Sequence, residues 1–158
     1  GNITQVETRR GATVLARTNY EYDLTSGTSN GGNVLKQWDL QGNRIDRAYN
    51  ASNQLTIETR YTAIDTNGPT TGGDPAAATA LTTRYVYDTS NRLRFTINAT
   101  GEVTEYLYGT TAGANGQVTT MRRFVGATYN VGALTPVQVI SLTSMTTWIS
   151  GKLAQTVV

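Results

Sequence analysis

The sequence predicts an all-β protein built of consecutive antiparallel β-hairpins that form one curved or spiralling sheet strip. The chain of 158 residues is only 15% charged and is rich in Thr, Gly, Asn and Ser, a composition that favours strands and tight turns. Short stretches of alternating side chains are separated by turn residues. A two-strand pattern also recurs along the chain.

The recurring unit is defined by intervals of eight and fifteen residues. An apolar residue is followed by Gly after eight positions and by Tyr after fifteen, in two sets: Leu93, Gly101, Tyr108 and Val34, Gly42, Tyr49. The junctions "YNASNQL" and "YDTSNRL" also share Tyr, Ser, Asn and Leu in register. The chain therefore contains a structural repeat, with loops inserted at some of its turns.

Each unit is predicted to consist of two strands and two turns. In the clearest copy, "RLRFTIN" is a strand, "ATGE" is a turn, "VTEYLY" is a strand and "DTSN" turns back. The Gly of the first turn provides a positive φ. The Asp or Asn that follows the last Tyr is expected to bond to its own downstream backbone and close the other turn.

Paired tyrosines are expected to share a face of the strip, because residues i and i+2 of a strand project the same way. The pairs are Tyr20 with Tyr22, Tyr85 with Tyr87, and Tyr106 with Tyr108. If successive units lie side by side, their rings form ladders, in which each cross-strand pair contributes roughly 0.2–1 kcal/mol.

Three inserted loops are predicted, at 24–32, 64–80 and 110–116. The second contains "DPAAATAL", in which Asp74 and Pro75 suit the start of one short helical turn. The terminal region 124–158 is predicted to add two or three weaker strands around a turn at Ser150–Gly151. The whole of 1–158 is taken as one repeat segment.

These residues resemble the YD repeat of Rhs proteins, bacterial Tc-toxin shell components and animal teneurins. The resemblance covers residues 18–123. It rests on "YVYDTSNRL" followed by "TGEVTEYLYG", in which Arg92 also matches, and on a drifted copy that includes Asn43, Asn50 and Gln54. The repeat-structural residues it implies are Tyr22, Asp23, Gly42, Tyr49, Leu55, Tyr85, Tyr87, Asp88, Leu93, Gly101, Tyr106 and Tyr108.

The resemblance implies a structural role without catalysis. Such repeats form a shell that encloses a C-terminal toxin or other polypeptide cargo within a large protein, secreted or at the surface of a bacterium. The partners implied are the rest of the parent chain and the cargo. Family shells often end in a cleavage segment of the Asp-Pro type, but here Asp74-Pro75 leads into "AAATA". The ends at Gly1 and Val158 favour an interior piece of a longer protein.

The composition excludes several classes of site. The chain has no Cys and no His, so it holds no thiolate nucleophile, Ser-His-Asp triad or imidazole metal site. Its net charge of +2 is spread along the chain, which argues against nucleic acid as a partner. No apolar run approaches the roughly 18 residues of a membrane span. No cofactor is expected.

Carboxylates are the remaining candidates for chemistry. Asp39 with Asp46, or Glu102 with Glu105, are possible acid–base pairs for glycoside hydrolysis, although the second pair lies on opposite strand faces. Solvated charges and turn caps explain them more simply. A calcium loop at Asp65, Asn67 and Asp74 has suitable oxygen ligands but lacks the regular spacing, and an ordinary inserted loop is the simpler interpretation.

Arginines and asparagines also have simple interpretations. Arg44, Arg47, Arg92 and Arg94 are expected to be mostly solvated, or paired with Glu58, Asp46 or Glu105 across strands. Asparagines at positions 2, 50 and 98 begin glycosylation sequons, and the sequence does not decide whether they carry glycans.

Two alternative functions stay open. The tyrosines, Trp38 and Trp148 suit a cell-surface adhesin or carbohydrate-binding module that recognises glycans. However, Trp38 aligns with Ile97 in the repeat, which predicts a packing role. A self-assembling extracellular β-protein is the second alternative, because an open strip has two sheet edges that invite further pairing.

Overall fold

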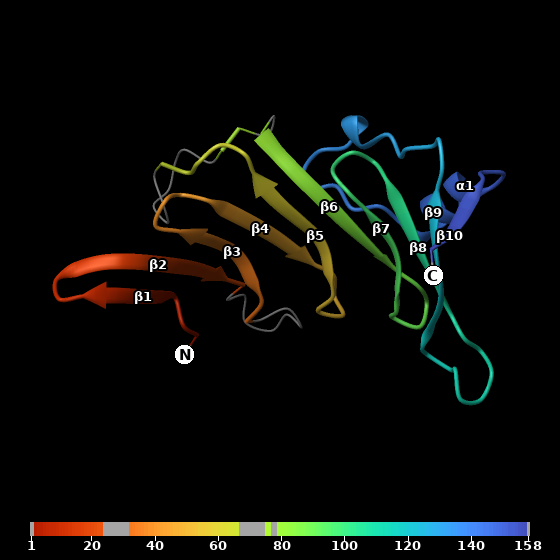
Figure 1. Ribbon diagram of the computed structural model, residues 1–158, viewed down its shortest axis with the longest axis horizontal. Helices are drawn as coiled ribbons and strands as arrows, with labels where there is room; N and C mark the ends of the chain where they lie inside the picture. Colours follow the sequence, from red (N-terminus) through yellow and green to blue (C-terminus); the bar gives the residue numbers. More distant parts are fainter. Residues whose placement is uncertain (1, 24–31, 67–74, 77–78, 158) are drawn as a thin grey trace. The chain divides into compact units, whose positions relative to one another are not determined.

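The computed structural model describes residues 2–23, 32–66, 75–76 and 79–157, and these form one open antiparallel sheet of ten strands in sequence order (Figure 1). The strands are β1 (Gln5–Arg10), β2 (Thr13–Tyr22), β3 (Val34–Asp39), β4 (Arg44–Tyr49), β5 (Leu55–Tyr61), β6 (Ala80–Tyr87), β7 (Leu93–Ile97), β8 (Val103–Tyr108), β9 (Val118–Phe124) and β10 (Ala154–Val157). Each strand neighbours the next along the chain, so the prediction of an all-β fold of consecutive antiparallel hairpins is confirmed.

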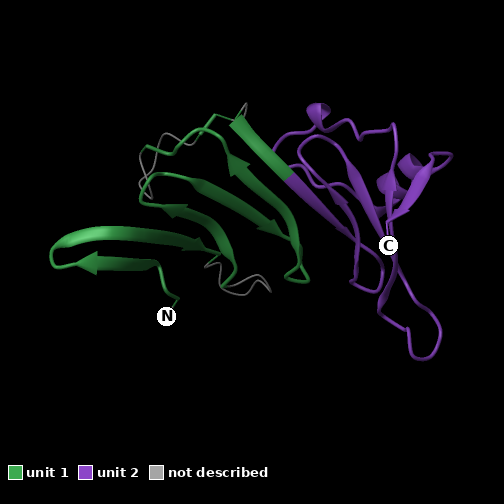
Figure 2. Cartoon of the chain, in the orientation of Figure 1, with its two compact units in different colours: residues 1–82 green, residues 83–158 purple. Residues whose placement is uncertain are grey.

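The chain divides into two compact units (Figure 2). Unit 1 is Gly1–Thr82 and unit 2 is Thr83–Val158, so the boundary falls within β6. The aligned repeats are distributed between them. The Val34–Tyr49 copy lies in unit 1, and the Leu93–Tyr108 copy lies in unit 2.

Unit 2 contains a buried apolar cluster on one face of its strands. Alternate residues of β6, β7 and β8 form its base: Val86, Phe95, Ile97 and Val103. Met145, which is fully buried, and Ile140 complete the cluster from the segment that follows β9. This segment therefore covers one face of the sheet in unit 2, and the tyrosines lie on the opposite face.

The segment after β9 corrects the sequence prediction, which expected two or three strands in 124–158. It contains a 3₁₀ turn, η2 (Val131–Ala133), the helix α1 (Leu142–Ile149) and one strand, β10. The side chain of Ser141 caps the helix by accepting a hydrogen bond from Ser144 N. Gly151, at φ 75°, follows the helix end, so the predicted turn at Ser150–Gly151 closes a helix and not a hairpin.

Unit 1 buries a more polar set of side chains. Trp38 and Ile57 are buried, and so are Arg44, Thr59 and Asp65. The hydroxyls of Thr59 and Thr82 lie 3.0 Å apart, which satisfies both groups within the sheet.

The predicted loops differ in how far they can be described. Residues 110–116 lie between β8 and β9, as expected. Residues 24–31 and 67–74 lie outside the described residues, including Asp74 of the predicted helical turn. Within its described part, Thr79 N donates to Ala76 O at 2.9 Å.

Candidate functional site

The two aligned repeats share one turn design, which accounts for the spacing of Asx residues. Asp39 Oδ1 accepts the backbone N–H groups of Gln41 and Asn43, both at 2.9 Å. Asp88 Oδ1 likewise accepts those of Ser90 at 2.8 Å and Arg92 at 2.9 Å. Asn50 and Asn98 make the same pair of bonds in the two remaining turns. An Asx side chain therefore closes each of these four turns.

These bonds affect the acidity of the two aspartates. Burial raises the pKa of Asp39, but hydrogen bonds from Asn43, Gln41 and Gly42 outweigh it and leave the pKa below its usual value. Burial also raises the pKa of Asp88, but the hydrogen bonds from Arg92 and Ser90 outweigh burial and leave this pKa below its usual value. Both side chains are therefore held as carboxylates, the better acceptors for a turn.

The amides of Asn50 and Asn98 are engaged on their donor side as well. Asn50 Nδ2 donates to Gln54 Oε1 at 2.8 Å, and Asn98 Nδ2 donates to Glu102 Oε2 at 2.6 Å. These two sequon asparagines thus have a structural use as turn caps.

A residue with positive φ stands before the last position of each turn. Gly42 has φ 87° and Gly101 has φ 85°, as expected for the glycine of the repeat. In the alternate turns Asn53 and Asn91 take this place, at φ 59° and 61°. Asn tolerates the left-handed region better than other non-glycine residues.

Gly42 and Gly101 have a second role that the sequence did not reveal. Asp65 N donates to Gly42 O at 2.7 Å, and Tyr129 N donates to Gly101 O at 2.8 Å. A Cβ on Gly42 would lie 2.4 Å from Asp65 O, and one on Gly101 would lie 2.3 Å from Tyr129 O. In each unit a later segment therefore docks on the backbone of the turn glycine.

The interval of fifteen residues corresponds to a hydrogen bond. Tyr108 Oη donates to Leu93 O at 2.6 Å, and Tyr49 Oη donates to Val34 O at 3.1 Å. In each repeat, the phenol of the last tyrosine thus binds the carbonyl of the first residue. Tyr22 makes the corresponding bond to Ile3 O at 2.7 Å, over nineteen residues.

Each of these junctions also contains a shift in strand register immediately before the tyrosine. The pairs that follow the shift are Tyr22–Val34, Tyr49–Leu55, Tyr87–Leu93 and Tyr108–Val118. An apolar residue therefore stands opposite the last tyrosine of the strand every time. Such irregularities twist and re-aim the strand at its end.

The register modifies the expected tyrosine ladders. Tyr87 faces Leu93, and β7 separates it from Tyr108, so apolar residues alternate with tyrosines across these strands. Tyr20 and Tyr22 make a ring contact at 6.3 Å, but within one strand. Tyr85 and Tyr106 are half-buried on the face opposite the apolar cluster.

Asp23 belongs to the same family of turns. Its N–H donates to Asn33 O at 3.0 Å, and its carbonyl accepts the N–H of Gly32 at 2.9 Å. Asp88 has the same two backbone bonds with Arg92 and Asn91. The turn design thus survives the insertion of a loop between its ends.

Arg44 is the centre of a charged cluster in unit 1. Its Nε and Nη2 atoms bind the two oxygens of Asp46 at 2.6 and 2.8 Å, and Nη1 binds Asp65 Oδ2 at 3.1 Å. Tyr61 Oη also donates to Asp46 Oδ2 at 3.0 Å. Arg44 pairs with Asp46 within β4, where the sequence analysis expected a pairing across strands. Its side chain is only 4% exposed, so its predicted solvation is wrong.

Glu105 occupies the equivalent position to Asp46 in unit 2 and is fully buried. Its Oε1 lies 2.6 Å from Arg94 Nη2, and its Oε2 lies 2.9 Å from Arg122 Nη2. The second contact is an ion pair without hydrogen-bonding geometry, since Glu105 Oε2 and Arg122 Nε have no hydrogen-bond partner within the described part of the chain. The sequence suggested the pairing with Arg94 but not the burial.

The other predicted acid and arginine positions are also accounted for. Arg47 Nε binds Glu58 at 3.1 Å, and Arg92 pairs with Asp88 at 2.8 Å. Glu102 is exposed and accepts from Asn98. Among the described residues, neither proposed acid–base pair keeps two available carboxylates: Asp39 caps a turn and Asp46 binds Arg44, and Glu105 binds Arg94.

Of the three residues of the calcium hypothesis, only Asp65 lies within the described part of the chain. Its carboxylate is buried against Arg44, and Asn67 and Asp74 lie outside the described residues. The described part of the chain contains no group of three or more Asp, Glu, His or Cys arranged to bind a metal ion. Nor does that part contain a helix long and apolar enough to span a bilayer.

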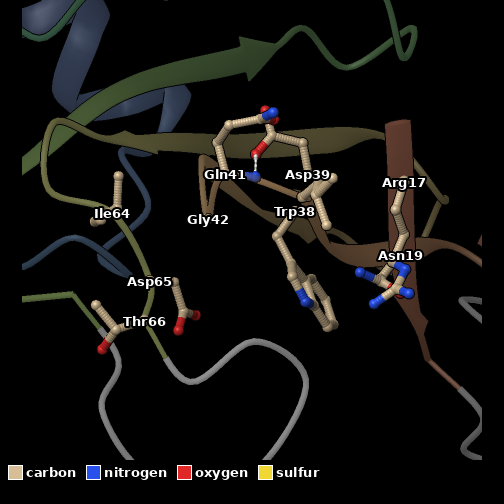
Figure 3. Close-up of a pocket in the computed structure, with 10 residues that line it drawn as sticks. Arg17, Asn19, Trp38, Asp39, Gln41, Gly42, Ile64, Asp65 and Thr66 are labelled. Atoms are coloured by element: carbon tan, nitrogen blue, oxygen red, sulfur yellow. Dashed lines mark hydrogen bonds between the residues drawn. The ribbon is translucent and has the colours of Figure 1, made fainter. Parts of the chain in front are cut away.

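A hollow of about 410 Å³ opens beside Trp38 in unit 1. Figure 3 shows the indole with Asp65 and Thr66 on one side and Arg17 and Asn19 on the other. Trp38 is 4% exposed, as its alignment with Ile97 predicted. Its Nε1, however, has no hydrogen-bond partner among the described residues, which the sequence could not show.

No family model matches the chain, and no curated protein matches it either. The case for its function therefore depends on the geometry of the repeats.

Proposed function

We propose that the chain is a non-catalytic structural segment of a YD-repeat shell. The parent is a large bacterial protein, secreted or at the cell surface, whose spiralling sheet encloses a toxin or other polypeptide cargo. The observation that carries this proposal is the repeated unit itself. The same Asx turns, turn glycine and tyrosine–carbonyl bond occur in both units.

A sheet of this kind is suited to act as a wall. Its strands pair with their chain neighbours in order, so few backbone groups of the inner strands are available to a protease, which needs unpaired chain. Each repeat closes with a hydrogen bond between its own ends, from its last tyrosine to the carbonyl of its first residue. Such a unit can be added repeatedly without a new fold.

The charges of the described residues also favour structure over chemistry. Five carboxylates that the sequence offered or the fold buried are bound to arginines or to turn backbone: Asp39, Asp46, Asp65, Asp88 and Glu105. A carboxylate whose oxygens are already bonded to Arg or to turn N–H groups has few lone pairs left with which to take a proton from a substrate.

The two terminal strands are the edges at which the proposed strip would continue. β1 and β10 stand at the ends of the strand order, and each pairs on one side within the described residues. Neighbouring repeats of the parent would cover these edges, which otherwise invite pairing with further copies. The proposal thus gives the edges a partner within the same protein.

Protection of the cargo tests this proposal. The full parent protein is treated with protease, once as wild type and once as the Gly42→Ala/Gly101→Ala double variant. Mass spectrometry follows cleavage of its C-terminal region. We expect slow cleavage in the parent and fast cleavage in the double variant. The matched control is Gly116→Ala, a site with φ 79° but open space around it. Equal cleavage in the parent and in the isolated C-terminal region would overturn the shell.

A further inference from the structure

Asparagine is followed directly by glycine once in each of the three predicted inserted loops and nowhere else in the chain. The three pairs are Asn30–Gly31, Asn67–Gly68 and Asn115–Gly116. Only the third pair lies within the described residues, in the loop that joins β8 to β9. In Figure 1 this loop extends beyond the ends of both strands, and both residues of the pair are exposed to solvent.

The turn at 114–117 explains the glycine of this pair but not the asparagine. Gln117 N donates to Ala114 O at 3.0 Å, and Gly116 supplies the positive φ, 79°, that the third position of a type II turn requires. Asn115 does not have a positive φ, so the pair is not the tight hairpin turn in which both residues need one. The carboxamide of Asn115 makes no hydrogen bond with any described residue.

The asparagines that cap the repeat turns are in a different situation. The side chains of Asn50 and Asn98 each accept two backbone N–H groups and also donate through Nδ2. These bonds fix the orientation of both amides, and each of the two residues is followed by alanine. Among the described residues, Asn115 alone combines an unbonded carboxamide with a glycine as its next residue.

An asparagine that precedes glycine can react with its own backbone. The backbone nitrogen of Gly116 attacks Cγ of Asn115 and forms a bond that closes a five-membered imide ring. The bond from Cγ to Nδ2 breaks, and ammonia leaves with the proton that the backbone nitrogen gives up. Water then opens the imide at one of its two carbonyls and leaves aspartate or isoaspartate at position 115, with no oxidation or reduction.

The geometry of the loop favours closure of this ring. Gly116 N donates to Gly109 O at 3.4 Å, beyond the usual range of about 2.7–3.2 Å, so the nucleophile is only weakly held. No atom lies within 4 Å of the position that a Cβ on Gly116 would take, so the peptide between the two residues has room to turn. The exposure of the pair gives water access to the imide.

We propose that Asn115 is a site of spontaneous deamidation, with water as the only co-reactant. Both products add a negative charge to the loop. Isoaspartate also carries the main chain through its own side-chain carbons, which lengthens the backbone by one atom. The bridge between Gly109 and Asn115 and the bond from Gln117 N to Ala114 O both span this position, so isoaspartate opens the tip of the loop.

The effect of this reaction is confined to the loop. The pairing of β8 with β9 begins at Tyr108 and Val118, outside the lengthened backbone, and therefore remains. The reaction needs no neighbouring repeat and no cargo, so the site stands or falls independently of the proposed shell.

Ageing of the protein at mildly alkaline pH tests the site, with peptide mapping by mass spectrometry as the measurement. The rate at each asparagine in the folded protein is divided by its rate in guanidinium chloride, which removes the intrinsic effect of the next residue. At Asn115 folding should slow the reaction by less than about tenfold, because one long hydrogen bond is lost. At Asn50 and Asn98 it should slow the reaction by more than about tenfold, because several bonds must break first.

Three variants separate the chemistry of the pair from strain in the loop. Gly116→Ala places a methyl group beside the nucleophile and should slow the reaction at least about tenfold. Gly113→Ala is the matched control, because Gly113 lies in the same loop with φ 93° and open space around it, and the rate at Asn115 should stay unchanged. Asn115→Gln would have to close a six-membered ring and should stay intact, with circular dichroism as the check on folding.

Hydrogen exchange compares the fresh protein with the purified isoaspartate form. The amide of Gln117 should exchange faster in the modified form, whereas the amides of β8 and β9 should keep their protection. Unchanged exchange at Gln117 would refute the opening of the loop.

Two further results would overturn the site itself. One is an Asn115 amide that survives ageing in the folded protein, whether or not the unfolded chain reacts. The other is equal slowing by Gly113→Ala and Gly116→Ala, because the rate would then follow strain in the loop and not access to the backbone nitrogen.

Discussion

Tyr108 Oη donates a 2.6 Å hydrogen bond to the carbonyl of Leu93, the residue that begins the same repeat fifteen positions earlier. The carbonyl lies on β7 and the phenol at the end of β8, so the bond joins the open end of a hairpin whose turn contains Gly101. Tyr49 and Val34 repeat this relationship in unit 1. The interval of fifteen residues is therefore the separation in sequence between the two ends of one hairpin, which this hydrogen bond joins.

Removing the hydroxyl of Tyr108 should destabilise the chain. Tyr108→Phe keeps the ring and leaves the Leu93 carbonyl without its phenol donor, so we expect a loss of about 0.5–1.5 kcal/mol in the free energy of unfolding, measured in urea. Tyr106→Phe is the matched control on the same strand, since no bond from its hydroxyl is found among the described residues. Equal losses in the two variants would contradict a role for the bond.

The turn glycine should be more sensitive to substitution than φ alone requires. Gly101→Ala meets both a positive φ of 85° and a backbone oxygen 2.3 Å from the new Cβ, so we expect a loss of about 3 kcal/mol or more. Gly116→Ala meets a similar φ of 79° in open space and should lose about 1–2 kcal/mol. Calorimetry or urea unfolding measures both. Similar losses would show that Tyr129 does not dock tightly on the turn.

The fold could be predicted from sequence wherever the information was local. Alternating strands, Asx turns and a glycine with positive φ each follow from residues a few positions apart, and the repeat multiplied the signal. The prediction for residues 141–151 was wrong because the Thr, Ile and Trp residues of this segment favour strands. The Ser141 cap and the burial of Met145 against the sheet favour a helix here. The cap is a local feature, whereas the burial of Met145 depends on residues far away in the sequence.

The candidate site was less accessible to prediction than the fold. Trp38 could be assigned to a core position by its alignment with Ile97, but the hollow beside it depends on Asp65 and Arg17, which approach from other strands and loops. The burial of Glu105 likewise depends on Arg122, which reaches it from β9. Register and docking of distant segments are not encoded in short motifs.

Glu105 should be a major electrostatic support of unit 2. Glu105→Gln keeps the shape but leaves Arg94 and Arg122 without their shared anion. We expect a loss of about 2–4 kcal/mol, somewhat reduced because both arginines reach solvent. Glu102→Gln, on the same strand but exposed, should change stability by less than about 0.5 kcal/mol. A neutral or stabilising Glu105→Gln would mean that the unsatisfied Oε2 outweighs the ion pairs.

Asp88 should make stability depend on acid pH in a predictable direction. Burial raises its pKa, but the bonds from Arg92 and Ser90 lower it more, so the folded-state pKa lies below the unfolded value of about 3.9. The stability that the carboxylate contributes is therefore fully present above that unfolded value, and is lost as the pH falls through the folded pKa. Asp88→Asn keeps the cap, as Asn50 does in the other repeat, and should lose less than about 1 kcal/mol at neutral pH.

The matched test of this dependence is reciprocal, with urea unfolding of each variant from pH 2 to 7. The gap between wild type and Asp88→Asn should narrow below about pH 4. Asn50→Asp places a carboxylate in the equivalent turn, where the N–H groups of Ser52 and Gln54 already bind its oxygen. It should gain an acid-sensitive contribution of the same sign, because hydrogen bonds to a carboxylate favour its charged form. A gap that stays constant with pH, or an Asn50→Asp variant whose profile matches the wild type, would show that the turns stabilise the charged and neutral caps equally.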